Sequence, residues 1–118
     1  MPKWTIEEAR EHYNIRGWGL GFFDINSKGN LVVRSNRKSK HDIDLKELVD
    51  DIQSKGYSLP ILIRFSDILK ASIANLADSF SKAITEYEYS GKYHGVYPIK
   101  VNQQRQVVEE VVKFGHPY

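Results

Sequence analysis

The sequence contains no cysteine. It can therefore have neither a disulfide framework nor a thiolate metal site. Small secreted domains usually depend on disulfides, so this absence favours an intracellular protein, and we expect a cytoplasmic location.

Long hydrophobic runs are also missing. The longest apolar stretch, LPILI at residues 59–63, is far shorter than the roughly 20 residues that a membrane span requires. The N-terminal stretch MPKWTIEEAR has no apolar core and carries acidic residues, so no signal peptide is expected. The net charge of +2 is too small to indicate a polyanionic partner. We therefore expect a protein that binds neither membranes nor nucleic acid.

The front of the chain predicts a helix followed by a β-hairpin. Thr5 precedes Glu8 by three residues, the spacing of a capping box, which predicts a helix over residues 6–13. Apolar and aromatic residues then lie on both sides of the turn-forming stretch DINSKGN. This pattern predicts strands at 18–24 and 30–35, with Gly29 supplying a positive φ.

A second helix is predicted after a polar, basic connector, NRKSKHD. Asp44 can cap it and Gly56 can end it. Its apolar residues recur at helical spacing and form one stripe: Leu45, Leu48, Val49 and Ile52.

The back half of the chain alternates apolar runs with helical patterns. LPILIRF (59–65) and GVYPIKV (95–101) are typical of strands covered on both faces. Ser66 can cap a long helix after the first run, and Asn102 a helix after the second, which Gly115 ends. The apolar positions of the two helices are Leu69, Ile73, Leu76, Phe80, Ile84 and Tyr87, then Val107, Val108, Val111 and Val112. Such alternation predicts an α/β fold with parallel strands.

Two strand–helix units cannot close a barrel or cover both faces of a sheet. We therefore expect this chain to be the front of a larger protein. Residues 1–41 would form the N-terminal helix and hairpin segment, and residues 42–118 the start of a (β/α)8 barrel that is incomplete here.

Several stretches resemble known binding motifs but lack features that those motifs require. GWGLGFF lacks the last glycine of a dinucleotide fingerprint, and Lys28 stands in DINSKGN where a calcium loop needs an oxygen ligand. The four histidines show no pair at metal-ligand spacing. A basic cluster, Arg34, Arg37, Lys38 and Lys40, could contact phosphates. It has no interleaved aromatic residues, so a solvated linker is the more frequent outcome.

Lys100 is the residue of most chemical interest. It is expected at the C-terminal end of the second apolar run, where α/β sheets and barrels assemble their active sites. A lysine there can form a Schiff base with an aldehyde, and burial among apolar side chains would favour the neutral, reactive amine. From spacing alone, however, a lysine at a strand end is most often a solvated charge.

The segment YPIKVNQQRQVVEE closely resembles the cofactor-lysine segment of biosynthetic arginine decarboxylases, which use pyridoxal phosphate. YNIRGWGLGFFDIN (13–26) is similar to the same family's N-terminal hairpin, and LPILIRFSDIL (59–69) to its first barrel strand and helix. The three matches occur in the family's order along almost the entire chain.

The resemblance implies a (β/α)8 barrel combined with a β-domain. It implies that Lys100 is the catalytic and cofactor-binding residue that holds pyridoxal phosphate. The implied reaction converts L-arginine to agmatine and CO₂ for polyamine and spermidine synthesis, in a protein expected to be a homo-oligomer at full length. The family also uses magnesium, for which no ligand can be assigned. Its phosphate-binding loop and ring-stacking histidine lie beyond this sequence, so we expect the 118 residues alone to be inactive.

Two alternatives stay open at this point. The chain could come from another basic-amino-acid decarboxylase of the same fold, acting on ornithine or diaminopimelate. It could also be a non-catalytic module that binds anions through residues 34–40.

Overall fold

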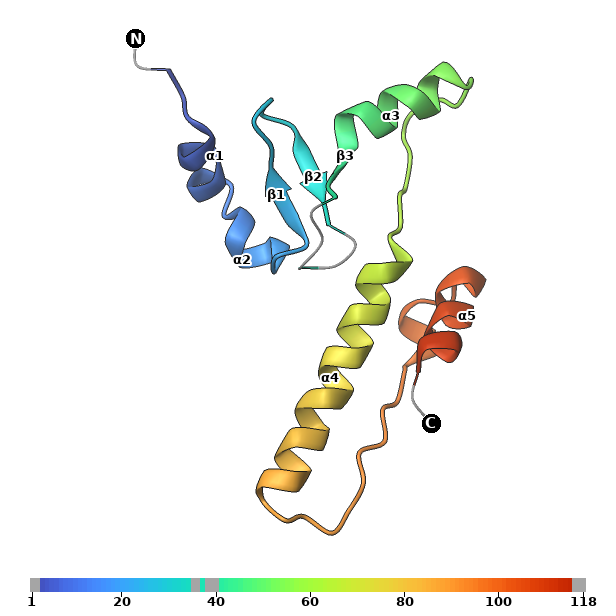
Figure 1. Ribbon diagram of the computed structural model, residues 1–118. Helices are drawn as coiled ribbons and strands as arrows, with labels where there is room; N and C mark the ends of the chain where they lie inside the picture. Colours follow the sequence, from blue (N-terminus) through green and yellow to red (C-terminus); the bar gives the residue numbers. More distant parts are fainter. Residues whose placement is uncertain (1–2, 35–36, 38–40, 116–118) are drawn as a thin grey trace. The chain divides into compact units, whose positions relative to one another are not determined.

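The computed structural model describes residues 3–34, 37 and 41–115. The chain divides into two compact units, Met1–Arg64 and Phe65–Tyr118, each described here by itself (Figure 1). The expected division at residue 41 concerns the domains of a longer protein and stays a prediction. None of the described helices is both long enough and apolar enough to cross a membrane.

Helix α1 (Ile6–His12) opens the first unit as predicted. The Thr5 hydroxyl oxygen accepts a hydrogen bond from the Glu8 backbone N–H at 3.2 Å, and the Glu8 carboxylate accepts one from the Thr5 backbone N–H at 2.7 Å. These reciprocal bonds form the capping box and satisfy two donors that a helix start would otherwise leave unpaired. A hydrogen bond from the Thr5 hydroxyl and, to a smaller extent, one from the Thr5 backbone N–H lower the pKa of the Glu8 carboxyl.

The first predicted strand, 18–24, starts earlier than the strand in the structure, Phe23–Ile25. Residues Ile15–Gly19 form a short helix, α2, flanked by Asn14 and Leu20 in the left-handed region, with φ of 49° and 50°. Ile15 and Gly19 are four residues apart and share its buried face. A Cβ on Gly19 would lie 3.2 Å from the Cβ of Phe23, so glycine permits a close approach there. The alternation of glycine and aromatic residues therefore reflects helix packing and not a pleated strand.

A three-stranded antiparallel sheet follows, in the order β1–β2–β3. The predicted hairpin is present as β1 (Phe23–Ile25) and β2 (Leu31–Val33), paired with Phe23 opposite Val33. Gly29 adopts the predicted positive φ, at 83°. The sequence did not predict β3 (Ile43–Asp44), which pairs with β2. Ser35, the predicted end of the second strand, lies outside the described residues.

Helix α3 (Leu45–Ser54) completes the elements of the first unit and agrees with the sequence. The Asp44 carboxylate accepts hydrogen bonds from the backbone N–H groups of Lys46 and Glu47, at 2.9 and 3.2 Å. Gly56 follows the helix with φ of 91°. The core of this unit is small, with four buried apolar side chains among its described residues: Ile15, Phe22, Val32 and Val33.

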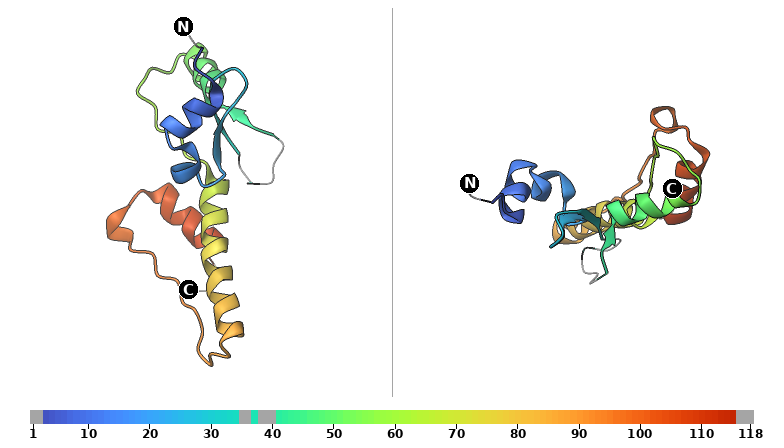
Figure 2. Two further views of the ribbon diagram at one scale, coloured as in Figure 1. Left: turned by 90° about the vertical axis from the view of Figure 1, so that its left-hand side faces the viewer. Right: turned by 90° about the horizontal axis from the view of Figure 1, so that it is seen from above.

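The second unit contains two helices that lie side by side, α4 (Ser66–Glu86) and α5 (Arg105–Phe114) (Figures 1 and 2). Val107 and Val111 of α5 are buried, as predicted. Val108 is half-buried and Val112 is 71% exposed, so only part of the predicted valine face turns inward. Gly115 ends α5 as expected.

Both predicted caps in this unit need correction. Phe65 is the N-cap residue of α4, and Ser66 is the first residue inside the helix. Asn102 does not cap α5, whose N-cap is Gln104. The Asn102 side-chain oxygen instead accepts a hydrogen bond from the Gln104 backbone N–H at 3.1 Å, which forms a local turn just before the helix.

The two predicted parallel strands are not strands in this structure. Residues 59–65 have no assigned strand, and residues 95–98 are extended but unpaired before a helical turn begins at Ile99. Half-buried and exposed residues still alternate along 61–65 and 91–98, which is the period of a strand. A strand also needs a hydrogen-bonded neighbouring strand, and neither segment belongs to the sheet of the described residues. The observed architecture is therefore mixed helix and a small antiparallel sheet.

Candidate functional site

Lys100 lies in the middle of a single 3₁₀ turn, η1 (Ile99–Val101). The Val101 backbone N–H closes this turn by donating to the Pro98 carbonyl oxygen at 3.0 Å. The Lys100 side chain is exposed, as are Ile99 and Val101 on either side. Apolar side chains do not enclose Lys100 among the described residues, because such walls would come from paired strands beside it and the described residues provide none.

Pro98 marks the point where the extended segment changes into the turn. Up to Pro98, odd-numbered residues are half-buried and even-numbered residues are exposed. Proline fixes its own φ, here −78°, and has no N–H to donate to a neighbouring strand. The strand pattern therefore breaks at Pro98, and the chain continues as a turn.

Two side chains brace the turn that carries Lys100. The Tyr97 hydroxyl donates a hydrogen bond to the Asn102 carbonyl oxygen at 3.2 Å. The Asn102 side-chain oxygen in turn accepts from the Gln104 N–H, immediately before α5. Hydrogen bonds thus hold the stretch from Tyr97 to Gln104 in place, and Lys100 lies within the segment that the Tyr97–Asn102 bond closes.

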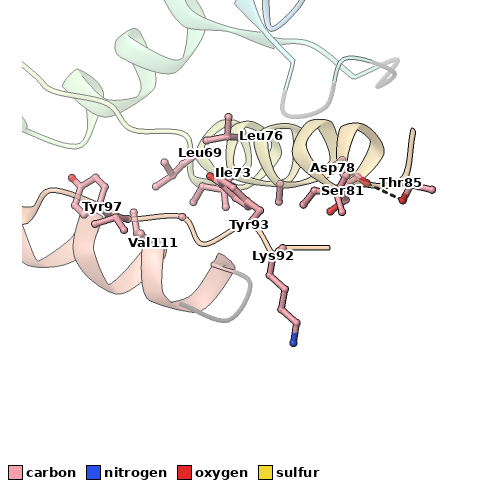
Figure 3. A pocket seen from close by; sticks show the side chains of 15 residues that line it. Leu69, Ile73, Leu76, Asp78, Ser81, Thr85, Lys92, Tyr93, Tyr97 and Val111 are labelled. Carbon is pink, nitrogen blue, oxygen red and sulfur yellow. Dashed lines mark hydrogen bonds between the residues drawn. The ribbon is translucent and has the colours of Figure 1, made fainter. Parts of the chain in front are cut away.

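A cavity of about 660 Å³ lies between α4, the extended segment 91–97 and α5 (Figure 3). Its apolar lining includes Leu69, Ile73, Leu76, Tyr97 and Val111. Lys100 does not line it. A smaller hollow of about 320 Å³ lies next to the turn instead and is bounded by Tyr97, Ile99, Val108 and Val111 among others. Tyr97 lines both hollows and lies shortly before the turn that carries Lys100.

The chemistry of the Lys100 amine fits attachment of an aldehyde cofactor. Across residues 3–34, 37 and 41–115, no hydrogen bond or ion pair engages its nitrogen. A lysine amine can form a Schiff base with an aldehyde once it has lost its proton. In the described part of the chain this amine is accessible and is not held by a carboxylate.

The basic cluster of the anion-binding alternative is largely engaged elsewhere. The guanidinium of Arg34 hydrogen-bonds Asp42 at 2.8 and 3.2 Å and Asp24 at 3.1 Å. The guanidinium of Arg37 lies 4.7 Å from the centre of the Phe22 ring. Lys38 and Lys40 lie outside the described residues. The two described cations therefore bind groups of their own unit, which weakens the case for an anion site.

Asp24 is the centre of a charge network that the sequence did not reveal. Its carboxylate also accepts a hydrogen bond from Arg10 of α1 at 2.7 Å, and Arg10 reaches the Ile25 carbonyl oxygen at 2.9 Å. Burial raises the pKa of the Asp24 carboxyl, but hydrogen bonds from Arg10 and the Ile25 N–H, with the charges of Arg10 and Arg34, outweigh it and hold this pKa below its ordinary value. The network ties α1 and the connector to the hairpin.

No magnesium ligand can be assigned. Among the residues that the structure describes, no three His, Asp or Glu side chains are grouped so that they could hold a metal ion. His12 packs edge-on against the rings of Trp4 and Tyr13. His116 lies outside the described part of the chain.

The sequence did not single out Tyr97 or Asp24. The spacing of polar residues gave no signal for either, because their partners are a backbone carbonyl and two arginines from separate elements. The strand-like alternation along residues 91–98 was the one signal that could have indicated an inward-facing Tyr97 ring.

Comparison with known proteins gives a consistent result. No protein-family profile matches the chain. Curated proteins named biosynthetic arginine decarboxylase match it at 55% identity in Gloeobacter violaceus and 48% in Geobacter sulfurreducens, in both cases over all 118 residues. The protein of that name from Prochlorococcus marinus is 49% identical over 112 residues, 95% of this chain.

The chain spans only a small part of these relatives. It covers 18% of the Gloeobacter protein, 19% of the Geobacter protein and 17% of the Prochlorococcus protein. The matched part is their N-terminal portion.

Proposed function

We propose that this chain is the N-terminal part of a pyridoxal-phosphate-dependent decarboxylase that converts L-arginine to agmatine and CO₂ in polyamine synthesis. The observation that carries the proposal is the identity of 55% and 48% over all 118 residues with proteins named biosynthetic arginine decarboxylase. Similarity that covers both units of the chain is stronger support than a match to the lysine segment alone.

We further propose that Lys100 is the residue that holds the cofactor. When bound, pyridoxal phosphate supplies an aldehyde for covalent attachment and a ring that accepts the electron pair released as CO₂ leaves. Lys100 would hold the cofactor through its side-chain nitrogen, which must first lose a proton. The exposed amine, without an ion pair among the described residues, is available for that attachment.

The remaining features of the proposal concern the longer protein. The extended segments 59–65 and 95–98 keep the alternation of strands, and in the longer protein they would pair as the first strands of a (β/α)8 barrel. Pairing on both sides would bury Lys100 and favour its neutral amine. The intact enzyme is proposed to be a cytoplasmic homo-oligomer that also uses magnesium, through ligands beyond this chain.

The proposal is tested on the intact protein by reduction with borohydride followed by digestion and mass spectrometry. Hydride addition makes the link between the cofactor and its lysine permanent. We expect the added mass on the peptide that contains Lys100. Lys100→Ala should lose both the label and at least about 99.9% of arginine turnover, the scale seen when a covalent catalytic group is removed.

A matched control is Lys92→Ala. Lys92 is an exposed lysine of the same extended segment, and its side chain extends away from α4 (Figure 3). This variant should keep the label and the activity. A label on another lysine would overturn the assignment of Lys100. Release of CO₂ from ornithine or diaminopimelate, but not from arginine, would overturn the substrate.

A further inference from the structure

We propose that Tyr97 is a positioning residue for Lys100: its hydroxyl bonds across the turn to the Asn102 carbonyl and holds the lysine backbone in one place. This inference rests on the proposed role of Lys100 in binding the cofactor. In this proposal Tyr97 holds Lys100 in place and does not itself react.

The hydrogen bond of Tyr97 encloses the lysine turn. It runs from the Tyr97 hydroxyl to the Asn102 carbonyl oxygen at 3.2 Å, and Lys100 lies midway between the two residues. Within the turn, the other tie is the bond from the Val101 N–H to the Pro98 carbonyl oxygen at 3.0 Å. Without the hydroxyl, one backbone bond would hold a turn whose three residues are all exposed.

The ring of Tyr97 is partly sheltered, so its hydroxyl is restricted in position. Tyr97 is half-buried and lines both hollows of the second unit, which Val111 of α5 also lines. An aromatic side chain has only two rotatable bonds, so it loses little freedom when it is held in one place. The phenol can therefore link this sheltered position to the turn through its hydrogen bond.

Lys100 has no side-chain partner to hold its amine within the described part of the chain. Its position is then determined by its backbone. Covalent capture of an aldehyde requires the amine to approach the carbonyl carbon in a defined geometry, so a loosely held turn lowers the fraction of productive arrangements. Loss of the Tyr97 hydroxyl should consequently weaken cofactor retention before it changes the fold.

The test is Tyr97→Phe in the intact protein, because this change removes one oxygen and keeps the ring. Two readouts are measured: the rate at which bound pyridoxal phosphate is lost on dialysis, and the visible circular dichroism per bound cofactor. We expect release to become about three- to tenfold faster, the effect of one lost hydrogen bond. The dichroism should decrease, since it reports how rigidly the cofactor is oriented.

Two variants serve as controls. Tyr93→Phe makes the same chemical change four residues earlier, where the ring stacks on Phe80 at 4.4 Å and the hydroxyl has no hydrogen bond in the described residues. It should behave as the unchanged protein. Val111→Ala shortens a buried side chain that lines the same hollows as Tyr97 and leaves the Tyr97 hydroxyl in place, so it calibrates how far lower stability alone affects retention.

The outcomes separate the two proposals. If the unchanged protein carries no cofactor on Lys100, the proposed function fails first. If it does and Tyr97→Phe matches Tyr93→Phe in release rate and dichroism, the positioning role is wrong while the function stands. The role is also wrong if the effect of Tyr97→Phe is no larger than that of Val111→Ala at an equal loss of melting temperature.

Discussion

Asp24 shows how a single side chain can hold several elements together. Its carboxylate is only 22% exposed and lies between two guanidinium groups, one from α1 and one that follows β2. Both arginines are largely sheltered as well, with side chains 26% and 30% exposed. Removing the shared anion would leave these two positive charges facing each other, which is costly where water has limited access.

We predict that Asp24→Asn loosens the attachment of α1. Arg10 and Arg34 donate to different oxygens of Asp24, and an amide has a nitrogen donor in place of one of them, so one of the two bonds is lost. Hydrogen–deuterium exchange of the α1 amides should become about tenfold faster, which corresponds to about 1.4 kcal/mol of local stability. Asp50→Asn is the control, because Asp50 pairs with Lys46 on an exposed helix face and such pairs contribute little. Equal exchange in the two variants would contradict the prediction.

The same residue predicts an acid dependence. The folded-state pKa of the Asp24 carboxyl is lowered, so its contribution is complete above the unfolded value of about 4 and is lost as pH falls through the lower, folded value. Exchange of the α1 amides, corrected for the intrinsic effect of pH, should accelerate below about pH 4. Asp24→Asn should show a smaller acceleration.

At the residue scale, the sequence offered a candidate for the chemistry but did not predict contacts. The resemblance of the surrounding segment points to Lys100, whose role stays a prediction. Its environment was not predictable, because exposure depends on which segments pair beside it. The Tyr97 and Asp24 contacts escaped for a related reason: both depend on where the backbone brings a carbonyl or a guanidinium.

Among the elements, the hairpin turn depends on one glycine. Gly29 has φ of 83°, and a Cβ placed on it would meet no atom within 4 Å. Backbone strain alone therefore determines the cost of a side chain. We predict that Gly29→Ala destabilises the β1–β2 hairpin by about 1 kcal/mol, measured as faster amide exchange in both strands.

Gly29→Asn provides the matched comparison, because asparagine adopts left-handed conformations more readily than alanine. It should cost less than Gly29→Ala. If both substitutions were neutral, the turn would have to be able to adopt another geometry.

Local signals predicted several elements correctly, although the caps predicted at Ser66 and Asn102 are not formed. The Thr5 capping box, the Asp44 cap and the turn at Gly29 each depend on residues within four positions of one another, and all three are present. Element prediction failed for α2, where glycine spacing was interpreted as a strand, and for segments 59–65 and 95–101. A strand is a property of two segments, and the sequence pattern of one cannot show whether the other is in place.

On the scale of the whole molecule, few side chains are enclosed. Among the described residues, six apolar side chains are buried, whereas many large ones are exposed, including Leu62 at 72%, Val96 at 88% and Val101 at 76%. Burial of apolar area is the main favourable term in folding. Exposed apolar residues of this kind are characteristic of surfaces that another part of a protein covers.

We therefore predict that the isolated 118 residues bind a hydrophobic dye, self-associate and release no CO₂ from arginine. Sedimentation, dye fluorescence and product analysis measure these properties. The intact protein is the control and should bind far less dye per mole of chain. A monodisperse isolated chain with a sharp thermal transition and measurable turnover would contradict the prediction.

One feature of the first unit limits how this chain can vary. The Asp44 carboxylate accepts from the side-chain amides of Asn26 and Asn30, at 2.7 and 2.9 Å, as well as from the two N–H groups at the start of α3. A carboxylate has about four acceptor positions, and all of them are occupied. Asparagine or serine at position 44 would leave at least one of these donors without an acceptor. The effect of a substitution at position 26, 30 or 44 therefore depends on which residues occupy the other two positions.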